Sequence, residues 1–310
     1  MKFFIFILFV STTNSFGATT EGESLPLSSI HFQPGVENWR ATTELGFYLL
    51  EKTYETNIRE FEEFNYQHIT SIITFDYGLS NDNSLSLGIH SSHNGRLKKI
   101  YDDDTPLSKV QMGYEGLEKV ELSFKSRFSQ YLSDGIDQSL IMKIQSGVVS
   151  AKDKNASIGQ TDFFAQYNFS FYLPRNYEFF GSLDIGYIGK KKKRRVDGET
   201  ENSDTYARMS IDLGLIKRFS RFYIVSDVSF GLTTNYNIKS PSYNITSDKG
   251  FFVRGKLGLG YETKKYLIEI FHVTRSDVFN KVLPEDQIPD PTLDYEWESS
   301  YTALRVAWLF

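Results

Sequence analysis

The sequence predicts an all-β fold: a transmembrane antiparallel β-barrel of about 12 strands, with short turns at one end and long loops at the other. Three observations predict it. Apolar and polar side chains alternate along most of the chain, with the period of two that a strand requires. The chain begins with a secretory signal but has no later run of the roughly 18 apolar residues that a membrane helix needs. It ends on an apolar strand whose final residue is aromatic.

Composition restricts the choice further. The chain is polar, with 24% charged residues, a net charge of −5 and a mean hydropathy of −0.35, yet 15% of its residues are aromatic. An exported chain of this kind is either a soluble β protein or a membrane barrel, in which each strand gives a weak hydropathy signal. The acidic balance argues against nucleic-acid binding. Because there is no cysteine, disulfides and thiolate metal sites are excluded. We also expect no metal of another kind and no other cofactor.

The first 17 residues have the three parts of a signal peptide. Met1-Lys2 is positively charged, Phe3 to Val10 is a short apolar core, and small residues precede a cleavage site between Gly17 and Ala18. We therefore expect the mature chain in the outer membrane of a Gram-negative bacterium. Residues 18–39 are polar and show no period, which predicts a periplasmic tail or a small plug before a barrel domain at 40–310.

Alternation sets out the strands of that barrel in order. It is clearest at 119–127, where Val120, Leu122 and Phe124 alternate with charged residues and serine. The same pattern predicts strands at 40–50, 69–79, 85–89, 119–127, 139–149, 162–173, 178–188, 206–219, 221–233, 251–262, 265–273 and 302–310. Most of these are long enough to cross a bilayer at a tilt.

The connections are of two alternating kinds. Short ones are expected near 80–83, 131–138, 174–176, 219–221 and 263–265. Long polar ones are expected at 51–67, 92–109, 151–160, 190–204, 235–249 and 276–297. A barrel with both termini in the periplasm has short turns there and long loops outside, whereas a soluble sandwich has no reason to alternate in this way.

The last strand resembles the assembly signal of bacterial outer-membrane barrels. One of its faces is lined by alternate residues that are mostly apolar, namely Thr302, Leu304, Val306, Trp308 and Phe310. The resemblance implies that Leu304, Val306, Trp308 and Phe310 are recognised by the barrel-assembly machinery. The same face is expected to contact outer-membrane lipid.

Two further stretches resemble transporter-like outer-membrane proteins of the family named for the meta pathway of phenol degradation. Residues 74–88 (TFDYGLSNDNSLSLG) are similar to that family's Tyr-Gly-Leu-Thr-Asp hairpin. Residues 116–128 (GLEKVELSFKSRF) are similar to its Gly-Leu-Gly-Asp strand, with Glu118-Lys119 in place of Gly-Asp. The resemblance implies an outer-membrane channel-like protein, with small hydrophobic or aromatic compounds as candidate solutes.

Charged residues of both signs fall on the faces expected to line the lumen. They either tune the selectivity of a water-filled pore or pair across a narrow interior and plug it. The candidates are Lys119, Glu121, Lys125, Arg127, Asp184, Arg208, Asp212, Asp227, Arg254, Lys256, Glu262, Glu269 and Arg305. The first hypothesis is passive transport, and the alternative is a plugged structural or adhesin-type barrel that acts through its loops.

A third hypothesis is a lipid hydrolase. Residues 90–96 (HSSHNGR) resemble the His-x-Ser-Asn-Gly-Arg segment of outer-membrane phospholipase A, in which a His can activate a Ser. Here His93 interrupts the motif, and alternation turns His90 inward, away from lipid. The basic run 190–195 is best interpreted as a solvated loop, with attraction to phosphates of surface glycolipid as the alternative. We therefore expect no enzyme.

Overall fold

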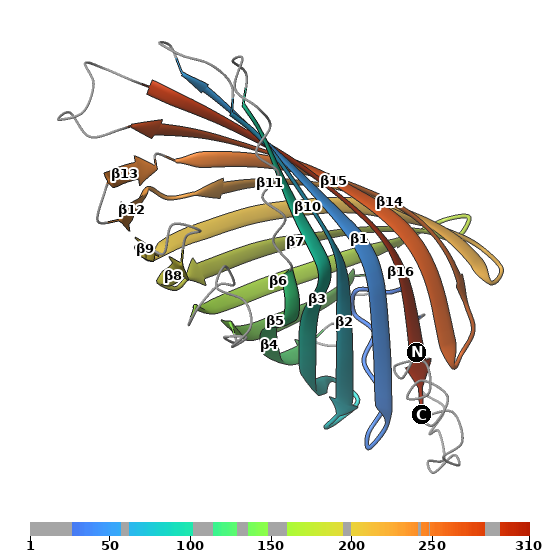
Figure 1. Ribbon diagram of the computed structural model, residues 1–310. Coiled ribbons are helices and arrows are strands. Elements are labelled where there is room, and N and C mark those ends of the chain that lie inside the picture. Colours follow the sequence, from blue (N-terminus) through green and yellow to red (C-terminus); the bar gives the residue numbers. More distant parts are fainter. Residues whose placement is uncertain are drawn as a thin grey trace.

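The computed structural model describes residues 27–56, 62–101, 114–128, 136–147, 160–194, 200–240, 243–247, 249–282 and 292–310. The chain forms a closed 12-strand antiparallel β-barrel, shown in Figure 1. The strands of the wall are β1 (Trp39–Thr56), β2 (Glu62–Gly78), β3 (Asn83–Tyr101), β4 (Tyr114–Arg127), β5 (Ile136–Gly147), β6 (Thr161–Leu173), β7 (Tyr177–Ile188), β10 (Tyr206–Phe219), β11 (Phe222–Thr233), β14 (Gly250–Glu262), β15 (Tyr266–Val282) and β16 (Thr292–Leu309).

Four short strands extend the sheet at one end of the barrel. They are β8 (Lys191–Arg194), β9 (Thr200–Ser203), β12 (Tyr236–Ser240) and β13 (Tyr243–Ser247). β8 pairs with β9, β12 pairs with β9 and β13, and β13 pairs with β15. These pairings lie within stretches that the sequence predicts to be long polar loops, so two of these loops contain short hairpin strands.

The barrel closes because the first and last strands pair. β16 lies between β15 and β1, and Arg40 faces Leu309 at the start of the β1–β16 ladder. The terminal Phe310 continues this contact, since its N–H donates to the Trp39 carbonyl at 2.8 Å. The C-terminal strand thus closes the barrel.

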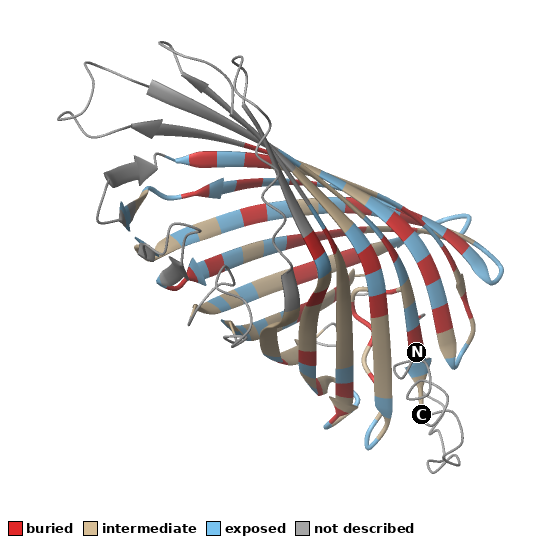
Figure 2. Cartoon of the chain, viewed as in Figure 1, coloured by how far each residue is buried: buried red, intermediate tan, exposed pale blue. Residues whose placement is uncertain are grey.

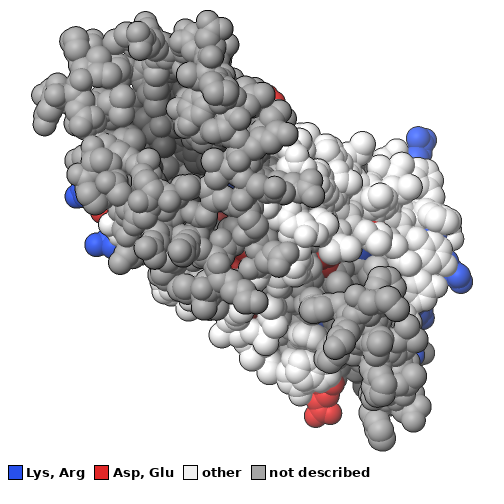
Figure 3. Space-filling model, viewed as in Figure 1, with Lys and Arg blue, Asp and Glu red and all other residues white. Residues whose placement is uncertain are grey.

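Side chains alternate between the two surfaces of the wall, as the banding in Figure 2 shows. On β16, Leu304, Val306 and Trp308 are exposed on the outer surface, and Ala303 and Ala307 are buried inside. In Figure 3, little basic or acidic surface appears across the middle of the described wall, and Lys and Arg side chains lie at its margins. The described ranges contain no helix long and apolar enough to span a bilayer.

The two ends of the barrel differ, and we name them by their connections. The turn end carries residues 79–82, 174–176, 220–221 and 263–265. The opposite end, which we call the loop end, carries β8, β9, β12 and β13. Outward aromatic residues collect at the turn end, where Trp39 lies 4.7 Å from Tyr77 and Tyr266 lies 5.7 Å from Trp308 between ring centroids.

The predicted strands correspond to the twelve wall strands, and the predicted range 206–219 coincides with β10. The largest differences are at the loop end, where β1, β2, β3, β15 and β16 continue into the predicted loops 51–67, 92–109 and 276–297. The reason is physical: a strand that has left the apolar layer keeps its hydrogen bonds but no longer needs an apolar face, so alternation fades from the sequence.

Candidate functional site in the barrel lumen

The lumen of the barrel is the candidate site. Six of the thirteen residues predicted to line it lie between two exposed neighbours on their strands, namely Asp184, Arg208, Asp212, Asp227, Glu269 and Arg305. Arg305, for example, lies between the exposed Leu304 and Val306. Which of these groups meet depends on the register between neighbouring strands, and alternation within one strand does not determine that register.

Arg305 is the centre of one luminal cluster. Its guanidinium binds Glu44 of β1 at 2.8 Å through Nη2 and lies 3.7 Å from Glu269 of β15. Tyr301 donates from its hydroxyl to Glu44 at 2.7 Å, and Lys256 binds Glu269 at 2.8 Å. This network joins β1, β14, β15 and β16 at the seam where the barrel closes. The ion pairs and the Tyr301 hydrogen bond replace the hydration that these carboxylates lose in the lumen, so the network offsets the desolvation cost of its members.

A second cluster lies on β7, β10, β11 and β14. Arg254 Nη2 is 3.1 Å from Asp212 and 3.5 Å from Asp227. Ser182 donates to the other oxygen of Asp212 at 2.7 Å. Nearby, Arg208 lies over the Phe252 ring at 4.9 Å, and Arg275 lies over the same ring at 4.2 Å. Asp184 forms no ion pair with them among the described residues, within a 4 Å limit.

The third cluster is built on Glu121 of β4. Lys143 lies 3.5 Å from one carboxylate oxygen, and Gln145 donates to the other at 2.6 Å. Lys119, one position along the same face, donates to the Gln145 side-chain oxygen at 3.2 Å. His90 Nε2 is 3.8 Å from Glu121, which places it inside the barrel as alternation indicates.

At the turn end, the luminal charges hold a segment of the chain as well as one another. We call residues 27–34 the inner segment. Lys125 donates to the carbonyls of Ile30 and, at 3.0 Å, of Phe32. Arg127 binds Asp137 at 2.7 Å. Figure 2 shows the inner segment as a mostly buried stretch within the outline of the barrel.

His31 anchors the inner segment to β5. The imidazole is fully buried, and its Nδ1 lies 3.0 Å from Ser139 Oγ, which also accepts from Asn168 at 3.2 Å. Burial, together with the positive charges of Lys125 and Arg127 and against an opposing effect of Asp137, lowers the pKa of His31 from 6.5 to about 3. His31 is therefore neutral at physiological pH.

A third group of contacts fixes the start of the inner segment. Arg218 binds Glu178 at 2.8 Å and Glu262 at 3.2 Å, and its Nη2 donates to Ser28 Oγ at 2.9 Å. The Ser28 N–H donates to Glu262 at 3.1 Å. Leu27 packs in the apolar cluster that also contains Phe180, Ile216, Tyr223, Val225, Leu267 and Ala307.

The predicted luminal residues omit several that the structure places in these clusters. Glu178 and Arg218 were missed although they continue the alternation of Asp184 and Arg208 toward the turn end. Extending each periodic face to the last residue of its strand would have found both. His31 and Asp137 carry no such signal, because the first lies outside any strand and the second lies at the start of one.

The segment considered for lipid hydrolysis does not bring its His and Ser together in a catalytic pair. His90 lies near Glu121, while the buried Ser92 hydroxyl has no hydrogen-bond partner among the described residues. The β3–β4 ladder shifts register on both sides of Ser91 and Ser92, so the periodic face is interrupted there. His93 instead lies 3.2 Å from Ser71.

Comparisons with known proteins agree with the fold. Neither family models nor curated protein sequences match this chain. Among solved structures, an outer membrane channel of Pseudomonas putida F1 aligns over 95% of this chain and 100% of its own, with 11% identity and a TM-score of 0.51. The Pseudomonas putida toluene transporter TodX covers 86% of this chain and 89% of its own, at 10% identity and a TM-score of 0.41. The outer membrane protease OmpT of Escherichia coli aligns over 91% of this chain and 99% of its own, with 9% identity and a TM-score of 0.36. The first likeness shows that this chain has the barrel fold of an outer-membrane protein, and the phenol-pathway family stays a prediction.

Proposed function

We propose that this protein is an outer-membrane channel for passive transport of small hydrophobic or aromatic solutes, and that its inner segment closes the turn end of the lumen. The observation that carries the proposal is the way this segment is held. Lys125 of β4 and Arg218 of β10 reach it from strands four positions apart in the wall, while the described residues 27–34 form no backbone ladder with any strand.

Contacts of this kind can be exchanged for water one at a time. A hydrogen bond between protein groups contributes only about 1 kcal/mol over the bond to water that it replaces. A segment held by a few such bonds and by the packing of Leu27 and Phe32 can therefore leave the lumen without opening the wall, whose twelve strands stay paired.

The luminal wall supports the solute class. Phe252 lies between Arg208 and Arg275, and Phe271 has Lys256 and Arg305 over its ring at 4.7 Å each. Both rings are buried beneath these cations, and the luminal charges are paired, so the wall presents no net charge that would select an ion, which suits an uncharged solute. This part of the proposal depends on the resemblance noted above as well as on the geometry.

The outer surface supports the membrane setting. An apolar band separates the aromatic residues of the turn end from the loop end, as in barrels whose outward face contacts lipid. We therefore propose outer-membrane lipid as the surrounding partner, a periplasmic turn end, and recognition of β16 by the barrel-assembly machinery after removal of residues 1–17.

Single-channel conductance of the mature protein in planar bilayers tests the proposal. We expect small or intermittent conductance for the full chain and a several-fold larger, steady conductance when residues 27–34 are deleted. Lys125→Met removes both donors to Ile30 and Phe32 without shortening the chain, and we expect it to raise the open fraction. The matched control is Lys217→Met, because Lys217 also donates to a backbone carbonyl, that of Arg175, but outside the lumen.

The alternative is a plugged structural or adhesin-type barrel, which the paired luminal charges favour. In that case the deletion variant would assemble but stay closed to ions and to small aromatic solutes in liposome-swelling assays. That result would reject the channel.

A further inference from the structure

A ladder of polar pairs runs up the outer surface of β15 and β16. The three cross-strand pairs are His272–Thr302, Thr274–Ser300 and Ser276–Glu298, and all six residues alternate with inward ones. His272 Nδ1 lies 2.8 Å from Thr302 Oγ1. A polar stripe on the lipid-facing side of a barrel wall is costly unless a polar group meets it.

The strands β10 and β11 have no such stripe. At corresponding distances from the turn end, the outward residues of β11 are Val228, Phe230 and Leu232, and all three are exposed apolar side chains. Those of β10 are likewise apolar, namely Leu213, Ile211 and Met209. The polarity of β15 and β16 therefore does not follow from depth alone.

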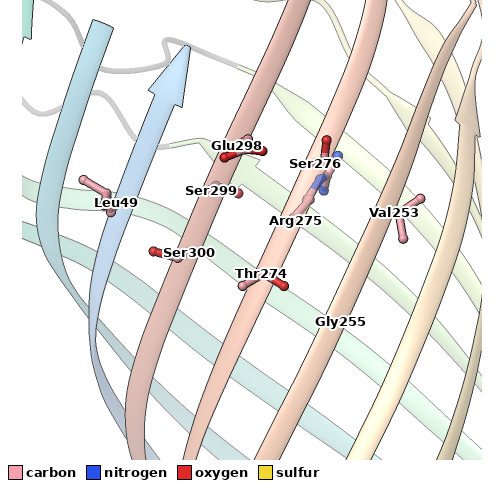
Figure 4. A pocket seen from close by; sticks show the side chains of 9 residues that line it. All are labelled: Leu49, Val253, Gly255, Thr274, Arg275, Ser276, Glu298, Ser299 and Ser300. Atoms are coloured by element: carbon pink, nitrogen blue, oxygen red, sulfur yellow. The ribbon is translucent and has the colours of Figure 1, made fainter. Parts of the chain in front are cut away.

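The upper part of the stripe borders a hollow of about 400 Å³ on the outer surface. Figure 4 shows residues of four neighbouring strands around it: Leu49 of β1, Val253 and Gly255 of β14, Thr274 and Ser276 of β15, and Glu298 and Ser300 of β16. Gly255 leaves room there, because an added Cβ would meet only Thr274 Oγ1, at 3.6 Å. The volume is within the range of small-molecule sites.

Charge and shape indicate what occupies the hollow. Glu298 is exposed at its rim and has no cationic partner among the described residues. Arg275 also lines the hollow, but its guanidinium lies over the luminal Phe252 ring and does not pair with Glu298. Toward the turn end the surface becomes apolar at Leu257 and Ile270, which are 62% and 54% exposed.

We propose that this hollow binds the head of a membrane lipid that carries an ammonium group. The ammonium donates to the Glu298 carboxylate and to the hydroxyls of Ser276 and Ser300, and an acyl chain lies along Leu257 and Ile270. A second copy of the chain fits less well, because two concave surfaces related by a two-fold axis leave the hollow unfilled. The inference does not depend on channel activity.

Native mass spectrometry of the mature barrel tests the site, with phosphatidylethanolamine and phosphatidylglycerol of identical acyl chains offered in equal amounts. An ammonium–carboxylate contact at a partly exposed site predicts about five-fold preferential retention of phosphatidylethanolamine. Glu298→Gln should bring the two lipids to nearly equal retention. Gly255→Leu, which fills the hollow, should abolish the retained lipid, whereas the control Ala165→Leu on the outer surface of β6 should keep the five-fold preference.

Three outcomes would overturn the proposal. The first is equal retention of both lipids by the unaltered protein. The second is an unchanged preference in Glu298→Gln, which would place the lipid elsewhere. The third is a dimer that Gly255→Leu dissociates, which would assign the surface to a second copy. Heat-modifiable migration on gels shows that each variant is a folded barrel before its bound lipid is measured by mass spectrometry.

Discussion

Ionisable side chains inside this barrel are stabilised by partners on neighbouring strands. Arg305 serves two carboxylates at once, Glu44 and Glu269, and Tyr301 adds a hydrogen bond to the first. The complete cluster adds little net stability, because the cost of removing its charges from water cancels much of their attraction. Removing one charge is nevertheless costly, because it leaves a partner charge in the lumen with less to balance it.

The substitution Arg305→Leu should therefore destabilise the barrel. Two acids would remain near each other in the lumen without their shared cation, and we expect a loss of roughly 2 kcal/mol, moderated by the partial exposure of the site. Urea unfolding in phospholipid vesicles, followed by Trp fluorescence, measures it. Arg305→Lys is the control, since it keeps the charge and should lose less. Equal stability of Arg305→Leu and the unaltered protein would contradict this account.

Closure by the inner segment should weaken in acid through His31. Its pKa is about 3 when docked, against about 6.5 in a released segment, so the released form binds the extra proton between these values. The His31 contribution to docking of the inner segment is therefore fully present above pH 6.5. As pH falls from 6.5 toward 3, the ratio of docked to released segment decreases by up to about tenfold per pH unit. Open probability in planar bilayers at pH 7.5 and 5 measures the effect.

His31→Asn removes this titration and keeps a polar side chain at the Ser139 contact. The variant should lose most of the acid-induced opening, although carboxylates of the lumen can retain a smaller pH effect. If the variant opens in acid as readily as the unaltered protein, His31 is not the titrating group.

At the scale of elements, the pairing of the first strand with the last closes the wall, which hairpins alone would leave as an open sheet. β16 supplies partners to both β15 and β1, and Phe310 extends its ladder through Trp39. The inner segment, by contrast, adds no strand but packs against side chains of β4, β5, β7, β10 and β14.

Removal of Phe310, or Phe310→Asp, should impair assembly without affecting secretion. The deletion takes away the donor to the Trp39 carbonyl, and both changes remove the terminal aromatic side chain. Loss of heat-modifiable migration on gels, with normal removal of the signal peptide, is the expected result. Phe310→Tyr, which keeps an aromatic ring, is the control. Full assembly of the truncated chain would show that β16 closes the barrel without its last residue.

At the scale of the whole molecule, the two ends of the barrel differ in ways that give it a direction in the membrane. Both β1 and β16 have their chain-terminal ends at the turn end, beside the aromatic pairs Trp39–Tyr77 and Tyr266–Trp308. The hairpins β8–β9 and β12–β13 extend the opposite end.

Protease added to intact cells should therefore cut within 190–204 and 276–297 and leave the turns at 174–176 and 263–265 intact. The physical reason is that a proteolytic enzyme cannot cross the outer membrane to reach the turn end. Mass spectrometry of the fragments locates the cuts, and lysed cells provide the control in which both ends are accessible. Cleavage only at the turns would show that the barrel is oriented the other way.

The sequence by itself determined the barrel, its twelve strands and the inward face of each, because a period of two is a local property that each strand shows alone. Only the tertiary structure decided which charges meet, where strands continue beyond the apolar layer, and that residues 27–34 lie inside. Arg305 meets Glu44 across 261 positions of chain, and Ser28 meets Glu262 across 234. Contacts across such distances depend on register and closure, which arise only when every strand has found its neighbours.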